Sequence, residues 1–240
     1  MLQNTKELYG NRLAALDGEV GRVKDFYFDD RTGALRYLVA DTGSWLTGRL
    51  VLLSPHAFGK LDQYENVLHI KLTKNQIENS PPIDSHRPVS RQYEIEYYRY
   101  YGWPAYWPAD QTWGMGSHLV IVPPPPEATA RSPRPTYAGR HLQSAQALTG
   151  YAIQTVDGAI GQVSGLMVDD RSWLIRDLVV EAGHWYAGKQ ILISKLKVER
   201  ISYEESKVYV NLTKADIQQT LENRAVWPSG DNHGMEKLIG

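Results

Sequence analysis

The chain has 240 residues, with 26 Lys and Arg against 27 Asp and Glu and a formal net charge of −1. Charges of both signs are interspersed without a basic stripe, which argues against binding nucleic acid through phosphate contacts. The absence of cysteine excludes disulfides, thiolate metal sites and a cysteine nucleophile. No run reaches the roughly 20 apolar residues of a membrane-spanning helix, and the first residues lack the pattern of a secretory signal. We therefore expect a cytoplasmic protein without a transmembrane segment.

The sequence repeats itself at a constant offset of 140 residues, without gaps, from Leu8/Leu148 to Ile77/Ile217. Asp-Gly-Glu-Val-Gly-Arg-Val at 17–23 returns as Asp-Gly-Ala-Ile-Gly-Gln-Val at 157–163, and Leu-Thr-Lys at 72–74 returns at 212–214. About 22 of roughly 70 aligned positions are identical, which indicates an internal duplication. The predicted divisions are a first copy at 1–80, a connecting segment at 81–145, a second copy at 146–222 and a flexible tail at 223–240.

Within the first copy, short apolar segments alternate with turn signals. The pattern predicts strands at 13–16, 20–28, 35–40, 49–53 and 67–72, and in the second copy at 160–168, 175–180, 190–193 and 208–212. The imperfect alternation of 20–28 is typical of a curved or bulged strand. Such short strands joined by tight turns favour a small closed antiparallel barrel, which removes sheet edges. Trp173 stands where the first copy has Gly33, so we expect the two hairpin tips to differ in shape.

Each copy is predicted to end in a short helix. Thr73-Lys74-Asn75-Gln76 has the spacing of a capping box, and Thr213 to Asp216 is a weaker form of it. We expect Ile77 and Ile217 to face the barrel.

The connecting segment is rich in aromatic residues. The pattern predicts a helix over 89–101 that begins at Ser90, with Tyr93, Tyr97 and Tyr100 or Tyr101 on one face. Three hypotheses remain open: the segment packs on and between its own barrels, it forms a partner or self-association surface, or it stacks nucleic-acid bases. We expect Trp103, Tyr106 and Trp107 to be largely buried, between the barrels or at a subunit contact. The candidate interaction residues are Tyr97, Tyr98, Arg99, Tyr101, Trp103, Tyr106 and Trp107.

A proline-rich stretch from Pro123 to Pro135 completes this segment, and its composition is typical of an extended or disordered linker. We expect proteases to cut near 126–140 and to spare 97–107.

The pairs Asp29-Asp30 and Asp169-Asp170 are the most attractive candidates for a divalent metal site, because carboxylate oxygens bind Ca²⁺ and Mg²⁺. Asp is also a favoured turn residue that caps nearby amides, and we favour this interpretation because both copies keep the pair, as expected of a turn inherited by duplication. Trp45 and Trp185 are expected to cover a barrel end. The scattered histidines show no zinc-binding spacing, and no Walker loop or nucleophile elbow is present. We therefore expect no cofactor and no enzymatic activity.

The pattern of Gly-x-x-Gly-x-Val, an apolar strand, Asp-Asp-x-x-Gly, an apolar pair and Trp-x-x-Gly resembles the PRC-barrel, over about 8–80 and 148–220. That fold occurs in the cytoplasmic part of the photosynthetic reaction centre H subunit and in the C-terminal part of the ribosome maturation factor. Tandem bacterial PRC-barrel proteins are also similar around Tyr97–Trp107. The resemblance implies two tandem small antiparallel β-barrels that act as protein-contact units in larger assemblies.

The sequence thus predicts a mainly β, non-enzymatic protein-interaction or assembly module. One alternative is a small-ligand or divalent-metal-binding protein, with its site between the barrels or at the Asp-Asp loops. A role related to the photosynthetic reaction centre rests on the family resemblance alone.

Overall fold

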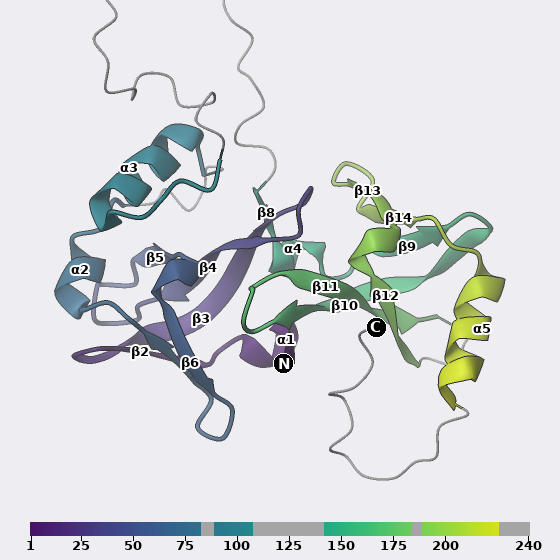
Figure 1. The fold of residues 1–240 in the computed structure, drawn as a ribbon, viewed down its shortest axis with the longest axis horizontal. Coiled ribbons are helices and arrows are strands. Elements are labelled where there is room, and N and C mark those ends of the chain that lie inside the picture. Colours follow the sequence, from purple (N-terminus) through teal and green to yellow (C-terminus); the bar gives the residue numbers. More distant parts are fainter. Residues whose placement is uncertain (83–88, 108–141, 184–188, 226–240) are drawn as a thin grey trace, which may run out of the picture.

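The structure, a computed structural model, describes residues 1–82, 89–107, 142–183 and 189–225. These residues are mainly β, with two seven-stranded sheets in tandem and a few short helices (Figure 1). The elements of the first half are β1 (Leu2–Asn4), α1 (Thr5–Leu8), β2 (Arg12–Ala15), β3 (Gly18–Asp29), β4 (Leu35–Asp41), β5 (Leu50–Leu53), β6 (Phe58–Asp62), β7 (Val67–Ile70), α2 (Lys74–Glu78) and α3 (Arg91–Tyr101). Those of the second half are β8 (Leu142–Ser144), α4 (Ala145–Leu148), β9 (Ala152–Thr155), β10 (Gly158–Asp169), β11 (Ile175–Ala182), β12 (Gln190–Ser194), β13 (Val198–Ser202), β14 (Lys207–Val210) and α5 (Lys214–Ala225).

The two halves have the same strand order, which confirms the tandem β organisation predicted from the repeat. One sheet runs β5-β4-β3-β2-β7-β6 and the other runs β12-β11-β10-β9-β14-β13. The pairs β2–β7 and β9–β14 are parallel, and the other pairs along these paths are antiparallel. Each path ends at two strands, β5 and β6 or β12 and β13, that do not pair with each other within the described residues. The expectation of closed barrels is therefore wrong, although only a short 3₁₀ turn (Pro55–Ala57 or Lys195–Lys197) separates the two terminal strands in sequence.

The same close approach of two strands explains the second glycine of the Gly-x-x-Gly motif in both copies. Gly21 has φ +138°, and a Cβ built there would lie 2.1 Å from the Asp41 carbonyl oxygen. Gly161 in the second copy meets the Glu181 carbonyl at the same 2.1 Å. The ladder between β2 and β3 shifts register at Leu13/Ala14, so the predicted bulge is present. Any side chain at these positions would push the neighbouring strand away.

Each half places its first seven-residue segment on the other half. We call residues 2–8 (β1 and α1) the first arm and residues 142–148 (β8 and α4) the second arm. The first arm pairs with β10 of the second half, where Leu2 opposes Asp169 and Asn4 opposes Met167. The second arm pairs with β3 of the first half, where Leu142 opposes Asp29 and Ser144 opposes Tyr27. The structural repeat therefore begins at residues 2 and 142, before the start of the clear sequence match.

The hairpin tips of the two copies also meet each other. Ala34 forms an isolated antiparallel bridge with Leu174, which is its own counterpart in the repeat, and Ile175 N–H donates to the Gly33 carbonyl at 2.8 Å. A pseudo-twofold axis between equivalent residues explains this pairing. Gly33 (φ +74°) and Trp173 (φ +53°) adopt the same left-handed backbone, so the expected difference in tip shape is wrong. The copies differ there in side chain only.

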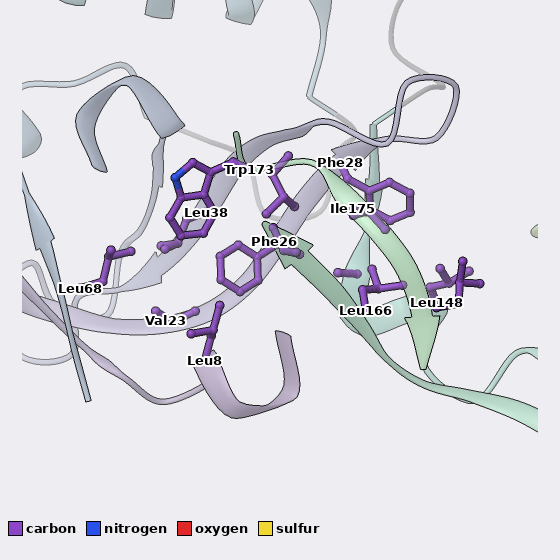
Figure 2. Packing of buried hydrophobic residues seen from close by; sticks show 14 of the residues in the cluster. Leu8, Val23, Phe26, Phe28, Leu38, Leu68, Leu148, Leu166, Trp173 and Ile175 are labelled. Carbon is purple, nitrogen blue, oxygen red and sulfur yellow. The ribbon is translucent and has the colours of Figure 1, made fainter. Parts of the chain in front are cut away.

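One continuous hydrophobic core spans both halves, as the close view in Figure 2 shows. Phe26 of the first half and Leu166 of the second lie in it with Leu8 and Leu148 from the two arms. The Trp173 ring reaches across from the second half to pack edge-on against Phe58, with ring centroids 4.6 Å apart. Because a module of this size buries too little surface for ample stability alone, the shared core stabilises both halves together.

The terminal helices follow the prediction. Thr73 and Gln76 form a reciprocal capping box at the start of α2, and Thr213 and Asp216 exchange the same pair of bonds at the start of α5. Ile77 is fully buried in the core, and its counterpart Ile217 is buried with it. Among the described residues, no helix has the length and apolar character needed to cross a membrane.

Candidate interaction surface

Helix α3 is built as the sequence predicts. The Ser90 hydroxyl accepts a hydrogen bond from the Tyr93 N–H at the N-terminus. Gly102 adopts the left-handed conformation (φ +68°) just past the last turn, and the Trp103 N–H donates to the Tyr98 carbonyl at 3.0 Å. This C-terminal cap reverses the chain direction, so the residues after the helix fold back along it.

The helix packs on the outer face of the first sheet, over β4 and β5 (Figure 1). A second hydrophobic cluster, separate from the shared core, forms at this contact; its buried members are Tyr37, Val39, Leu52, Tyr97, Tyr98 and Trp107. The Tyr97 ring meets Tyr37 edge-on at 5.4 Å. The described residues 89–107 of this segment thus cover the first module.

Tyr97 also bonds to the backbone at the edge of the first sheet. Its hydroxyl donates to the Leu52 carbonyl at 2.9 Å and accepts from the Ser54 N–H at 3.0 Å. Burial raises the pKa of Tyr97 well above its ordinary value, so the hydroxyl stays protonated and keeps both bonds.

A buried carboxylate lies in the same contact. Glu94 of α3 is fully buried and accepts hydrogen bonds from the Tyr37 hydroxyl at 3.0 Å and from the Tyr106 hydroxyl at 2.5 Å. Burial, with the charge of Glu94 next in importance, raises the pKa of Tyr37. The Arg36 guanidinium lies 3.7 Å above the Tyr106 ring and forms an ion pair with Asp29. Hydrogen bonds from two hydroxyls offset part of the cost of burying the carboxylate.

Beyond this contact, an aromatic patch remains partly open to solvent; we define it as Tyr100, Tyr101, Trp103 and His56. Trp103 stacks on Tyr101 at 4.4 Å and on His56 at 5.6 Å. Tyr100 is 41% exposed and meets Tyr101 edge-on at 4.8 Å. Burial raises the pKa of Tyr101 to about 12. These ring contacts hold the side chains of the patch against one another.

The structure divides the candidate interaction residues into two groups. Tyr97, Tyr98 and Trp107 are buried against the first module, so they hold the helix and cannot touch a partner while it is docked. Tyr101, Trp103 and Tyr106 are half-buried, and Arg99 is exposed. His56 and Tyr100 belong to the patch although sequence reasoning did not select them. His56 lies in the first copy, far from the aromatic run in sequence, and only the fold brings it to Trp103.

The first Asp of each pair shapes its hairpin turn. Asp29 Oδ1 accepts from the N–H groups of Arg31 and Thr32 at 3.0 and 3.2 Å. Asp169 accepts from the Ser172 hydroxyl at 2.7 Å, and this hydrogen bond lowers the pKa of its carboxyl. These bonds match the capping role that Asp takes in turns.

The second Asp of each pair contacts the other half of the protein. Asp30 accepts from the Tyr203 hydroxyl of the second half at 3.3 Å. Asp170 binds the amino group of Met1 at 2.7 Å. Within the described ranges, no group of three or more His, Asp or Glu side chains is placed to hold a metal ion.

Sequence reasoning missed a buried acid, Asp25, where β3 of the first half meets the second arm. Asp25 Oδ2 accepts from the Ser144 hydroxyl at 2.5 Å, and Oδ1 accepts from the Gln146 N–H at 3.0 Å, both in the second arm. Burial raises the pKa of Asp25, against these hydrogen bonds and one from the Phe26 N–H. The second copy has Gly165 at this position, where a Cβ would lie 2.5 Å from Asn4 Oδ1 of the first arm. The two exchanged contacts therefore differ in chemistry although they share one geometry.

Trp45 lies beside an open depression of about 620 Å³ in the first module, which Glu19, Arg22, Lys24 and Asp41 also line. The ammonium of Lys74 lies 4.9 Å from the centre of the Trp45 ring. Trp45 packs against the shared core, in keeping with the expected covering role. Its counterpart Trp185 and the predicted cleavage region at 126–140 lie outside the described residues.

These features define a class of small β module, duplicated and joined by exchanged arms, with an aromatic helix on one face. Residues 7–78 match the family model of the PRC-barrel domain, so the first module is a PRC-barrel domain. The second module is a similar β-sheet region with the same strand order, in keeping with a tandem protein of this kind. A search of the curated proteins finds no significant match to the chain.

Proposed function

We propose that the protein is a non-enzymatic interaction or assembly module, in which the two joined halves serve as a rigid base and the aromatic patch contacts a protein partner. The half-exposed stack of Tyr101, Trp103 and His56 is the observation that supports this proposal most. Aromatic residues and Arg are enriched among the residues that dominate binding energy. Arg99 is exposed on the last turn of α3.

The test is crosslinking of the full chain in cell extract, followed by mass spectrometry of the captured proteins. We expect an Arg99→Ala/Trp103→Ala variant to lose partners that the unchanged protein captures. Tyr64→Ala is the matched control, because Tyr64 is fully exposed on the turn between β6 and β7, away from α3. The same partners with all three proteins would refute the patch as a contact surface.

Ligand binding is a second candidate, which the depression beside Trp45 favours. Glu19, Arg22 and Lys24 line it in the first copy, whereas the second copy has Ala159, Gln162 and Ser164 at these positions. The fold therefore does not require these charges. The metal version is tested by calcium titration of the melting temperature, since a ligand of the native state raises it by mass action. No shift at millimolar calcium would end that version.

A further inference from the structure

The first sheet ends at β5, and one side chain bonds to two backbone groups at this edge. Outward-facing backbone groups on a terminal strand are a template on which another chain can form a strand. On β5, the Leu52 carbonyl and the following Ser54 N–H both bond to the Tyr97 hydroxyl of α3. A neighbouring strand would offer the same donor and acceptor from its own backbone. Tyr97 thus takes the place of a strand partner.

The apolar composition of β5 makes the contact of α3 with this edge important. Its sequence is Leu50-Val51-Leu52-Leu53, four apolar residues without a charge. Proteins usually protect such edges with charged side chains or with a covering element. The corresponding strand of the second half, β12, is followed by Lys195 and Lys197, where the first copy has Pro55 and Ala57. The two copies protect equivalent edges in different ways.

The cover is held by a contact that includes a buried charge. Glu94 lies between α3 and β4 and depends on the Tyr37 and Tyr106 hydroxyls. A buried carboxylate stabilises a contact less than a well-packed apolar group of the same size. The docked helix is therefore opposed by the cost of removing this charge from water.

We propose that α3 is a displaceable internal cover of the β5 edge, and that the uncovered edge pairs with β5 of a second copy of this chain. Sheet extension by a short strand is already how the halves join, through β1 on β10 and β8 on β3. Antiparallel pairing of two β5 strands with the Leu52 residues opposite each other satisfies the edges by twofold symmetry. This proposal rests on the proposed assembly function and names its site and partner.

The test uses the full chain, which has no cysteine of its own, so that one introduced thiol reports one position. The Glu94→Lys substitution places an ammonium where two hydroxyls need an acceptor, near Arg36, and is expected to release α3. Release is measured by hydrogen exchange at residues 91–101. Tyr97→Phe is the milder second variant, since it keeps the ring and removes both edge bonds.

Each releasing variant is combined with Leu52→Cys or, as the matched control, with Leu192→Cys at the equivalent position of β12. Opposed antiparallel residues have Cα atoms about 4.5–5.5 Å apart, within the range that a disulfide bridges. After mild oxidation, we expect a crosslinked dimer with Leu52→Cys in the released protein. We expect only the 27.2 kDa monomer for Leu192→Cys. We expect the same for Leu52→Cys in a protein without the releasing substitution, because α3 still covers β5.

Three results would overturn the proposal: released protein that stays monomeric, equal crosslinking at both positions, or α3 that stays docked in both variants and is thus a fixed part of the module. Capture of the same partners by the Arg99→Ala/Trp103→Ala variant, together with intact β5 crosslinking, would refute only the wider proposed function. Loss of crosslinking with the patch partners retained would refute only this inference.

Discussion

Replacing Trp173 with glycine is expected to weaken both halves at once, because this side chain belongs to the second half and packs in the first. Trp173 is 7% exposed, and its ring meets Phe58 at 4.6 Å. A large aromatic side chain buries about 150–250 Å², which at about 25 cal/mol per Å² corresponds to about 4–6 kcal/mol. Glycine relieves the left-handed backbone (φ +53°) and returns about 1 kcal/mol. The expected net loss is about 3–5 kcal/mol, as for other large aromatic truncations.

Urea unfolding followed by far-ultraviolet circular dichroism measures this loss. Since the two halves share one core, we expect a single transition at lower urea with its slope unchanged. Trp173→Phe is the control, because it keeps a ring against Phe58 and should lose much less. A loss below about 1 kcal/mol for Trp173→Gly, or unfolding of the second half alone, would refute the reasoning.

The remaining predictions concern three local contacts. The Asp25 pKa is raised by burial, so its contribution to stability is largest at low pH and is lost as the pH rises through the folded pKa. The unfolding free energy of the natural protein minus that of Asp25→Asn should thus fall as the pH rises above about 4, the ordinary pKa of Asp, and a flat difference in urea titrations would contradict this. Gly21→Ala forces a Cβ to 2.1 Å from the Asp41 carbonyl and should cost about 2–4 kcal/mol by thermal melting, well above Gly43→Ala, whose Cβ meets nothing within 4 Å. Asp17 Oδ1 accepts from the Lys74 N–H at 2.7 Å and caps α2, so Asp17→Ala should cost about 1 kcal/mol in urea; no measurable loss would exclude this cap.

The repeat predicted most of the two sheets because every long strand is bounded by a turn signal that occurs twice. Asp17-Gly18 and Asp157-Gly158 fixed the start of β3 and β10, and Thr73 and Thr213 fixed the helices that follow. The strands β6 and β13 were missed, since their apolar and polar residues do not alternate regularly. Barrel closure was also wrong, because it depends on whether the terminal strands meet, and no local pattern encodes that.

The exchanged arms left only a faint trace in the sequence. Leu2-Gln3 returns as Leu142-Gln143, but a three-residue strand is too short for periodicity to reveal. Its partner strand also lies in the other copy. The aromatic segment shows the same limit, because the spacing of Tyr93, Tyr97 and Tyr101 predicted a helix and its apolar face but not the sheet that it covers. Which sheet the helix covers depends on the side chains of Tyr37 and Leu52. That these side chains lie on the outer face of the sheet follows only from the register of β4 and β5.

Hydrogen exchange of a variant that lacks residues 1–8 tests most directly whether the halves are joined by exchanged arms. The first arm pairs with Met167 to Asp169, and its Thr5 hydroxyl accepts from the Leu166 N–H at 3.2 Å. We predict that the amides of 166–169 in the second half lose protection, whereas 27–29 in the first half, paired with the second arm, retain more of it. Loss confined to the first half, with 166–169 unchanged, would contradict the exchange.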